Sequence, residues 1–529
     1  MELGHDGRVV SDEQQQGLVF PADAEGRRST SNLGRAVVAD ALRPTDPTGA
    51  RAAEQTSSWR SDYLVHFRRL VEAGLASPDA AVSVARSGLD SLHQRMRVVG
   101  HDGEERRLGD WPDSSRDARI EDPAFEDAEI RGAEIHGTGE PVGELVLPYR
   151  GEALRGDQIR RRIGAWVDAG VVEPSVGDAI DRVLANPQWL RLEGHTVAVL
   201  GAAAEMGPLP SLMRWGARVA AVDLGRPAIW QRVLTMAHVG AGTLVVPFSG
   251  LEGAGREGTG GEGVGGEGVD QEGVALEQVA GADLLNEVPA LAHWLLEQPG
   301  TLVLGNYVYA DGSTHTRVSM AVDELTRRLQ ADRADVALAF LATPTDVFAV
   351  PAEAVEDSTR AYDGRSVRSK TLGRPLRTLS GGRLLRRNYV AGSAPGINDS
   401  LVPQQGPNYA LAKRLQRWRA TVARHEGATV SLNVAPPTRT RSVIKNRALA
   451  AAYAGAHRFG VEVFEPATAN VLMAALLVHD LHTDGGPRHE HPWQDEAYAA
   501  SHGGLWRTPY SPRSALGLAA LLGYGAAQR

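Results

Sequence analysis

The chain has 529 residues, enough for one large domain with additions or for several domains, and 42% of them are hydrophobic and 23% charged, as in globular proteins. A net charge of −9 and a pI near 6.0 do not indicate a nucleic-acid-binding surface, and zero cysteines exclude disulfides, thiol nucleophiles and thiolate metal sites. No apolar segment follows a basic start at the N-terminus, and no run of about 18 apolar residues occurs, so we expect a cytoplasmic protein without a membrane span.

The first 194 residues divide into two parts by their pattern. Residues 1–55 are rich in Asp, Arg, Gly, Gln and Ser without sustained periodicity, which predicts a largely disordered segment. Residues 56–194 are predicted to form a helical N-terminal extension with a polar loop in its middle. Apolar side chains recur at helical spacing in four segments: 59–75, 79–97, 156–170 and 175–185.

After residue 194 the pattern changes to alternating strands and helices. Continuous apolar runs of strand length occur at residues 196–201, 217–224, 242–250, 300–306, 335–342 and 427–434. This alternation predicts a doubly wound parallel α/β sheet of the Rossmann-like kind over residues 195–485. The glycine- and glutamate-rich stretch 250–277 is expected to be a surface insertion, and residues 486–529 a C-terminal tail with an apolar helix.

The turn after the first apolar run has features of a dinucleotide-binding site. It reads Gly201-Ala-Ala-Ala-Glu-Met-Gly207, and Asp223 follows Gly201 by 22 residues. A glycine turn lets a pyrophosphate approach the backbone, and an acid about 20 residues later can bind a ribose hydroxyl. Glu205 stands where a middle glycine is usual. Asp223 favours NAD whereas Arg226 would accept the 2′-phosphate of NADP, so both cofactors stay open, with NAD preferred.

Lysine is rare in this chain, since only Lys370, Lys413 and Lys445 occur among its 56 lysines and arginines. Lys413 follows Tyr409 by four residues in a segment with helical periodicity, so both side chains are expected on one helix face. A nearby ammonium favours phenolate and lowers the pKa of a tyrosine from about 10, which suits a general acid at a carbonyl or a base at an alcohol. We therefore predict a catalytic pair of Tyr409 and Lys413.

The order of these motifs resembles that of the short-chain dehydrogenase/reductase family over roughly residues 195–480. The other matching elements are Asp283-Leu284, Leu304-Gly-Asn306 after the fourth run, and Asn433-Val-Ala-Pro436-Pro-Thr438-Arg-Thr440. The resemblance implies that Tyr409 donates or accepts the proton and that Lys413 binds the nicotinamide ribose. It also implies cofactor contacts for a set of residues: Gly201, Gly207, Asp223, Asp283, Asn306, Pro436, Thr438 and Thr440.

The family's catalytic serine has two candidate positions. Ser393 lies 16 residues before Tyr409, close to the family's usual interval, and we predict it as the hydroxyl that hydrogen-bonds the reacting oxygen. The segment FLATPTDVFAVP instead looks like the strand end that carries this group in extended members of the family. That alternative would give the role to Thr343 or Thr345 and make residues 351–400 a large insertion.

Together these features predict an NAD(P)-dependent oxidoreductase that transfers hydride between the nicotinamide and a carbonyl or secondary alcohol. The added helices and insertions hint at a bulky small-molecule substrate or a partner, and homo-oligomers are common in the resembling family. Two alternatives stay open: an NAD(P)-dependent epimerase or dehydratase, and a non-catalytic nucleotide-binding or scaffold protein on a degenerate Rossmann domain. The second is suggested by Glu205 and by the absence of asparagine between Asn306 and Asn388, where the family carries a relay asparagine.

A histidine-rich segment near the C-terminus is a candidate metal site. The segment from 479 to 502 contains His479, His482, His489, His491 and His502. His-x-x-His followed by His-x-His could bind zinc, but a polar loop with solvated histidines is the favoured interpretation. No metal site is therefore predicted.

Overall fold

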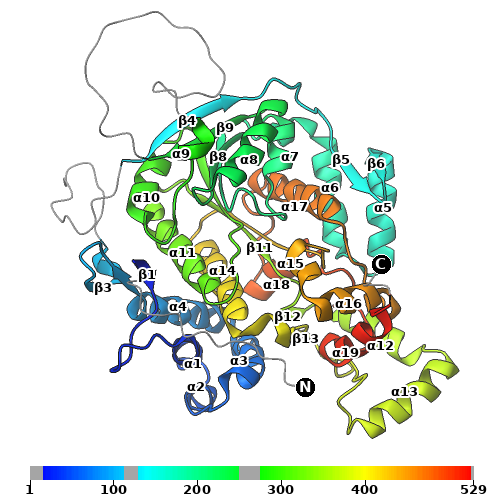
Figure 1. Cartoon of the computed structure of the whole chain (residues 1–529). Helices are drawn as coiled ribbons and strands as arrows, with labels where there is room; N and C mark the ends of the chain where they lie inside the picture. The colour runs from blue at the N-terminus through cyan, green and yellow to red at the C-terminus, as the bar shows by residue number, and fades with distance from the viewer. Residues whose placement is uncertain (1–15, 112–128, 250–274, 526–529) are drawn as a thin grey trace, which may run out of the picture.

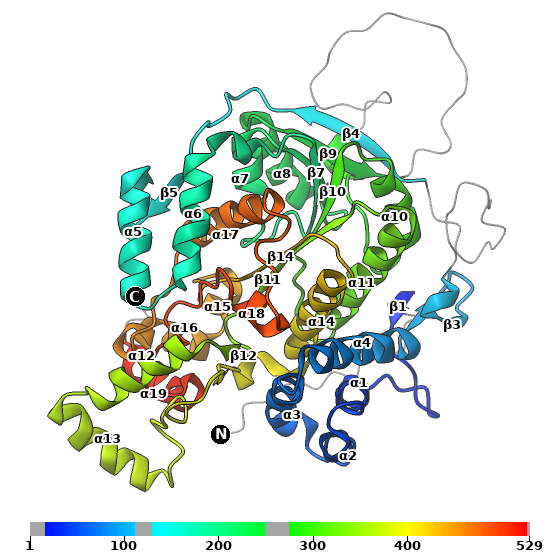
Figure 2. The same cartoon turned by 180° about the vertical axis from the view of Figure 1, so that it is seen from behind.

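The computed structural model describes residues 16–111, 129–249 and 275–525 (Figures 1 and 2). Most of the predicted glycine-rich insertion, residues 250–274, lies outside the described ranges, as do the first 15 residues of the segment predicted to be disordered. No helix in the described ranges is both long enough and apolar enough to cross a membrane.

A seven-stranded sheet forms the centre of the molecule, in the order β14-β11-β10-β7-β8-β9-β4. Its strands are β4 (Arg131–His136), β7 (His195–Leu200), β8 (Arg218–Val222), β9 (Thr243–Phe248), β10 (Thr301–Asn306), β11 (Ala337–Ala342) and β14 (Val430–Val434). All neighbours are parallel except β4, which pairs antiparallel with β9 at one edge. The six predicted strands are confirmed, and their spatial order, counted along the chain as 3-2-1-4-5-6, is compatible with a Rossmann-like fold.

The sheet is buried on both faces, which explains why its strands are continuous apolar runs. Alternate side chains belong to two separate cores: Val197 and Val199 of β7 to one, Ala198 and Leu200 to the other. The first core also contains side chains of α5 (Asp157–Asp168), α6 (Pro174–Ala185), α7 (Leu209–Trp215), α8 (Pro227–Val239) and α17 (Pro466–Leu481). The second contains side chains of α10 (Val288–Leu296), α11 (Thr314–Asp332) and α14 (Gly406–His425). The fold is thus mixed α/β with helices on both faces of a mostly parallel sheet (Figure 1).

The N-terminal region differs from its prediction. The part of residues 1–55 that the structure describes is ordered, and the prediction of disorder is wrong there. Its elements and the next ones are β1 (Gly17–Val19), α1 (Thr30–Leu42), α2 (Pro47–Glu54), α3 (Trp59–Gly74), α4 (Pro78–Arg95), β2 (Arg97–Val99) and β3 (Glu105–Arg107). Leu33, Val37 and Ala41 of α1 are buried in the same core as α14 and lie on one face of this short helix, which the polar composition of the surrounding segment had masked.

The segment predicted as a helical extension also contains strands. The expected polar loop includes β4, which extends the central sheet, and it is followed by the hairpin of β5 (Val146–Tyr149) and β6 (Glu152–Arg155). Alternating polar residues in β4 suit a sheet edge, and this pattern was not recognised as a strand. The N-terminal segment is therefore partly built into the central sheet.

Two additions follow the last strands of the sheet. Between β11 and α14 lie β12 (Val347–Val350), α12 (Ala352–Asp363), α13 (Val367–Leu379) and β13 (Gly396–Asp399), with β12 and β13 antiparallel. After β14 come α15 (Arg441–Lys445), α16 (Arg447–Gly455), α18 (Pro492–Ala497) and α19 (Pro512–Gly523). The two additions meet, because Ser511 donates its backbone amide to the Arg386 carbonyl at 2.9 Å.

Candidate functional site

The strand order reverses between β7 and β10, and in open α/β sheets this is the place where ligands bind. Gly201, directly after β7, has φ +81°, and a Cβ there would lie 3.0 Å from the Tyr307 carbonyl oxygen behind β10. Both the left-handed backbone and the close approach of the two strand ends require glycine. The carboxyl ends of β7 and β10 are therefore drawn together at the predicted glycine turn.

The turn after β7 is tied to the end of β8. Asp223 accepts hydrogen bonds from the backbone amides of Ala203 at 2.9 Å and of Leu224 at 2.8 Å. Gly207 closes the turn by donating its amide to the Ala204 carbonyl at 3.0 Å. The structure thus brings together three of the predicted cofactor residues, Gly201, Gly207 and Asp223.

Asp283 belongs to the same edge of the sheet. The amide of its neighbour Ala282 donates to the Asp223 carbonyl at 3.0 Å, which places the segment before α10 beside the end of β8. The Asp283 carboxylate accepts hydrogen bonds from the Leu285 amide at 2.9 Å and from the Asn286 side chain at 2.6 Å. These contacts hold its carboxylate in a local turn.

Glu205, the residue that departs from the glycine pattern, has a cationic partner. Its carboxylate accepts the backbone amide of Arg441 at 2.8 Å, and the Arg441 side chain pairs with it at 3.0 Å. These contacts join the glycine turn to the segment after β14. The negative charge of Glu205, which by itself would repel a pyrophosphate, is therefore paired with an arginine.

The predicted residues after β14 lie in that joined segment. The Thr438 hydroxyl donates to the Pro436 carbonyl at 2.8 Å, and the hydroxyl of Thr440 lies 3.0 Å from that of Ser442. Thr438 is buried, whereas Thr440 is half-buried and occupies the N-cap position of the short helix α15. Through Arg441 this segment contacts the glycine turn.

Tyr409 and Lys413 lie one turn apart on α14, and both are half-buried. Burial raises the pKa of Tyr409, a hydrogen bond with Thr343 partly opposes this, and the charge of Asp346 raises it further. The expectation that Lys413 lowers the pKa of Tyr409 is therefore wrong for this structure, because burial dominates. Tyr409 remains a protonated phenol at neutral pH.

Lys413 contacts only neutral groups. Its Nζ donates to the Gln416 side-chain oxygen at 3.0 Å and to the Leu341 carbonyl at 3.4 Å, and no carboxylate among the described residues pairs with it. Burial lowers its pKa to about 8. Gln416 in turn donates to the Asn306 side chain at 3.3 Å. A chain of contacts thus runs from the end of β10 to Lys413, and Gln416, three residues beyond Lys413, could have been found by helical spacing.

The structure places Thr343, and not Ser393, at Tyr409. Thr343 follows β11, is near enough to Tyr409 for its hydroxyl to lower the pKa of the phenol, and lies 2.8 Å from Thr345 between their hydroxyl oxygens. Ser393 lies in a turn before β13, where its hydroxyl donates to the Val390 carbonyl at 2.9 Å. The preference for Ser393 is corrected, because the insertion between β12 and β13 carries it to that turn.

His315 is a site residue that the sequence interpretation missed. It lies on α11, the helix after β10, on which the family's relay asparagine was sought, and its ring is 5.4 Å from that of Tyr409. Its Nδ1 accepts the Ala310 amide at 3.0 Å. Burial first, and then the charge of Lys413, lowers its pKa to about 3, so the ring is neutral. No motif spacing in the sequence pointed to His315.

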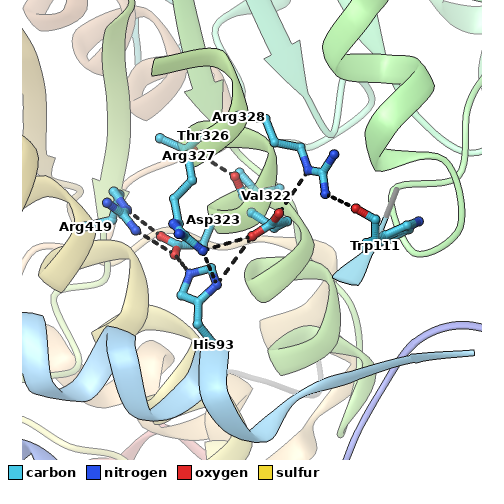
Figure 3. Close-up of polar contacts among 9 residues, drawn as sticks. His93, Trp111, Val322, Asp323, Thr326, Arg327, Arg328 and Arg419 are labelled. Carbon is cyan, nitrogen blue, oxygen red and sulfur yellow. Dashed lines mark hydrogen bonds and ion pairs between the residues drawn. The ribbon is translucent and has the colours of Figure 1, made fainter. Parts of the chain in front are cut away.

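Buried ion pairs fix α14 in the fold. Arg414 and Arg417 each donate to the buried carboxylate of Asp346 at 2.7 Å, and Arg417 also pairs with Glu496 at 2.6 Å. Arg419 binds Asp323 of α11 through two hydrogen bonds of 2.7 and 2.9 Å (Figure 3). Bidentate guanidinium contacts of this kind hold a helix in one register. They determine where Tyr409 and Lys413 lie.

The Arg419 contact belongs to a larger polar network between α4, α11 and α14. In Figure 3, His93 of α4 points toward Asp323, and its Nε2 lies 2.7 Å from the carboxylate. Glu324 pairs with Arg328 at 2.9 Å, and Arg328 donates to the Trp111 carbonyl at 2.8 Å. The network ties the N-terminal helices to the helix that carries the candidate site.

The histidine-rich segment has structural contacts. His502 lies 2.8 Å from Glu173, His489 2.7 Å from Asp495, and His482 3.2 Å from the Trp189 carbonyl. Within the ranges that the structure describes, no three histidine, aspartate or glutamate side chains are grouped so that they could hold a metal ion.

No protein-family model matches the sequence, and no curated protein sequence matches it either.

Proposed function

We propose that the protein is an NAD(P)-dependent oxidoreductase of the short-chain dehydrogenase/reductase kind, acting on a carbonyl or a secondary alcohol. The observation that supports it most is the convergence of Tyr409, Thr343 and Lys413 beside the reversal point of the sheet. A buried phenol with a hydroxyl partner suits proton transfer to a carbonyl oxygen. The proposed Rossmann-like domain accounts for the strand order and for the glycine turn after β7.

The residues at the sheet edge fit a dinucleotide. Gly201 lets the backbone come close to a pyrophosphate, Asp223 lies where a ribose hydroxyl would be bound, and Lys413 has an ammonium without a carboxylate partner. Asn306, joined to Lys413 through Gln416, would line the adenosine side. When bound, the cofactor would supply or accept the hydride. NAD is preferred over NADP because Asp223 is held in place, although the exposed Arg226 would suit a 2′-phosphate.

The protein's own groups would move the proton. In reduction, the Tyr409 hydroxyl gives its proton to the carbonyl oxygen while the carbonyl carbon accepts hydride, and solvent later returns a proton to the phenolate. Thr343 would hold the reacting oxygen, and the Lys413 ammonium would stabilise the phenolate that forms. Burial raises the pKa of Tyr409, so the phenol carries its proton in the free protein but is a weaker acid than an exposed tyrosine.

A second candidate is a nucleotide-binding protein without catalysis. It is favoured by the pairing of Glu205 with Arg441, which spans the glycine turn and would have to yield to a pyrophosphate. An epimerase or dehydratase that keeps the cofactor is a further alternative, since it would use the same proton donor. The intact group of Tyr409, Thr343 and Lys413 makes the oxidoreductase the first choice.

Cofactor titration tests the proposal directly. Cofactor-stripped protein is titrated with NADH and NADPH, following nicotinamide fluorescence, for wild type, Lys413→Met and Tyr409→Phe. We expect saturable binding of one cofactor, roughly tenfold weaker in Lys413→Met and unchanged in Tyr409→Phe. Arg51→Met, a loss of a cation on the exposed side of α2, is the matched control. Folded protein that binds neither cofactor would contradict both enzymatic candidates.

A further inference from the structure

A cavity next to the candidate site has no role in the proton and hydride transfer proposed above. It is lined by the segment after β13, by α16 and its following turn, and by α19. Two residues connect it to Tyr409. Thr345 lies on the cavity wall, and its hydroxyl oxygen is 2.8 Å from that of Thr343. Tyr453 of α16 also lies on the wall, and burial first, and then a charge on Tyr409, raises its pKa. A molecule whose oxygen lies at Tyr409 could therefore extend into this cavity.

Except for Tyr453, whose hydroxyl has no hydrogen bond to the described residues, the polar side chains on the cavity wall have partners. Thr345 donates to Gln405 at 2.9 Å, Thr508 donates to the Phe459 carbonyl at 2.8 Å, and Arg513 pairs with Asp399 at 2.7 Å. The hydroxyl of Ser400 donates to the Asn398 side chain. A charged or strongly hydrogen-bonding ligand would lose its hydration here without equivalent contacts in return, which is unfavourable.

The remaining wall is aliphatic and aromatic. It includes Leu401, Val402, Ala452, Phe459, Ala515 and Leu516. Apolar walls with few polar groups are typical of sites for apolar ligands. The chemistry of the wall therefore selects hydrocarbon.

Small residues on α16 and α19 create the space. A Cβ at Gly455 would overlap the Ala519 carbonyl and a Cβ at Gly523 the Ala451 carbonyl, so the two helix backbones touch. Ala452 and Ala456 on one side and Ala515 on the other then face the cavity without filling it. Because the helices cannot move closer, a larger side chain at these positions would occupy the volume that a ligand uses.

We propose that this cavity binds the apolar part of the substrate, an aliphatic or alicyclic group attached to the reacting carbonyl or secondary alcohol. This inference rests on the proposed oxidoreductase function, since it places the reacting oxygen between Tyr409 and Thr343. For a 2-alkanone, the carbonyl carbon gains hydride from NADH or NADPH, which is oxidised, and the oxygen gains the Tyr409 proton. The product is the 2-alkanol, and its alkyl chain lies in the cavity.

A homologous series of ketones tests the inference. Reduction of 2-butanone, 2-hexanone, 2-octanone and 2-decanone is followed by loss of the reduced cofactor's absorbance. Each methylene that enters the cavity should raise kcat/KM by up to about fourfold, the factor that corresponds to removing one CH₂ group from water. Ala456→Phe should lower kcat/KM for 2-octanone at least tenfold and leave 2-butanone within about twofold. Ala448→Phe, an exposed position on the same helix, is the matched control and should behave like wild type.

A second variant and a binding measurement separate this inference from the function on which it rests. Leu516→Ala enlarges the cavity from α19 and should shift the preferred ketone to a longer chain, which keeps the test valid if Ala456→Phe does not fold. Without any cofactor, the uncharged fluorophore N-phenyl-1-naphthylamine should bind wild type and Ala448→Phe, be displaced by 2-decanone, and bind Ala456→Phe at least tenfold more weakly.

The outcomes differ for the two proposals. Ketone reduction that is independent of chain length, or equal in Ala456→Phe and Ala448→Phe, overturns the cavity inference and leaves the oxidoreductase function standing. Displaceable fluorophore binding that Ala456→Phe weakens, in a protein that binds neither NADH nor NADPH, supports an apolar ligand in the cavity and contradicts the oxidoreductase function. No fluorophore binding by folded wild type overturns the cavity inference.

Discussion

Two groups of basic residues on α14 differ in what surrounds them. Arg414, Arg417 and Arg419 are buried against carboxylates from other elements, whereas Lys413 meets only the neutral oxygens of Gln416 and Leu341. A guanidinium can bind two acceptors at once and keeps its charge, so it suits permanent structural pairs, while an unpaired ammonium keeps its charge available for a ligand. On α14 the arginines thus stabilise the fold, and the lysine is the cation that remains for the proposed chemistry.

The largest effect is expected at the arginine side. Asp346→Ala leaves Arg414 and Arg417 buried without their shared carboxylate, so the free energy of unfolding should fall by about 3–5 kcal/mol. Urea denaturation measures it. Asp335→Ala removes an exposed partner of Arg333 and should cost less than about 1 kcal/mol. Equal losses in the two variants would show that the buried pairs do not hold α14.

Unlike Asp346→Ala, Tyr409→Phe should lower activity strongly and stability little. Loss of the proton donor should reduce kcat/KM for a ketone about 100-fold or more. The free energy of unfolding should change by about 1 kcal/mol or less, because the ring is kept and only the contact with Thr343 is lost. The measurements are steady-state kinetics and urea denaturation on the same preparation, and an unchanged kcat/KM would remove Tyr409 from the mechanism.

The hydroxyl at Tyr409 gives a smaller, sharper test. Thr343→Val keeps the shape of the side chain and should lower kcat/KM about tenfold by removing one hydrogen bond to the reacting group. Ser393→Ala removes only a turn hydrogen bond to Val390 and should leave kcat/KM unchanged. If Ser393→Ala were the variant that loses activity, the assignment made from the structure would be reversed.

The smallest effect is the pH dependence of stability at the contact between α14 and Asp323 of α11. Burial alone would lower the pKa of His93, but hydrogen bonds to Asp323 and Glu324 outweigh burial and the nearby Arg327 charge, so the pKa is raised. Because the folded pKa lies above the unfolded value near 6.5, the stability contributed by His93 is complete below that pH and is lost as pH rises through the folded pKa. The stability difference between wild type and His93→Gln, measured by urea denaturation, should therefore be larger at pH 6 than at pH 8.5. A difference that does not depend on pH would show that His93 is not charged in the fold.

Much of the site's framework could be predicted from local patterns. The strands β7, β8, β10 and β11 follow from continuous apolar runs, and the shared helix face of Tyr409 and Lys413 follows from their spacing of four. The helix α1 was missed although seven of its 13 residues are Ala, Val or Leu, because it stands in a segment that is otherwise rich in polar residues. A stricter reading of helical periodicity would have found it.

The hydroxyl partner and the neutral histidine could not be predicted in this way. Thr343 and Ser393 are 66 and 16 residues from Tyr409 in the chain, and the nearer one is carried away by the β12–β13 insertion. His315 reaches Tyr409 only because α11 and α14 pack on the same face of the sheet. No local spacing records such contacts.

The sequence alone determined the six parallel strands and the helix α14, because continuous apolar runs suit strands buried on both faces and a period of 3.6 residues suits a helix. It also determined that Lys413 stands apart among arginines. Only the tertiary structure decided which cations are buried with carboxylates, which hydroxyl meets Tyr409, and that burial raises the pKa of this tyrosine. These outcomes depend on desolvation and on distances between elements remote in the chain, which exist only after the layers have packed.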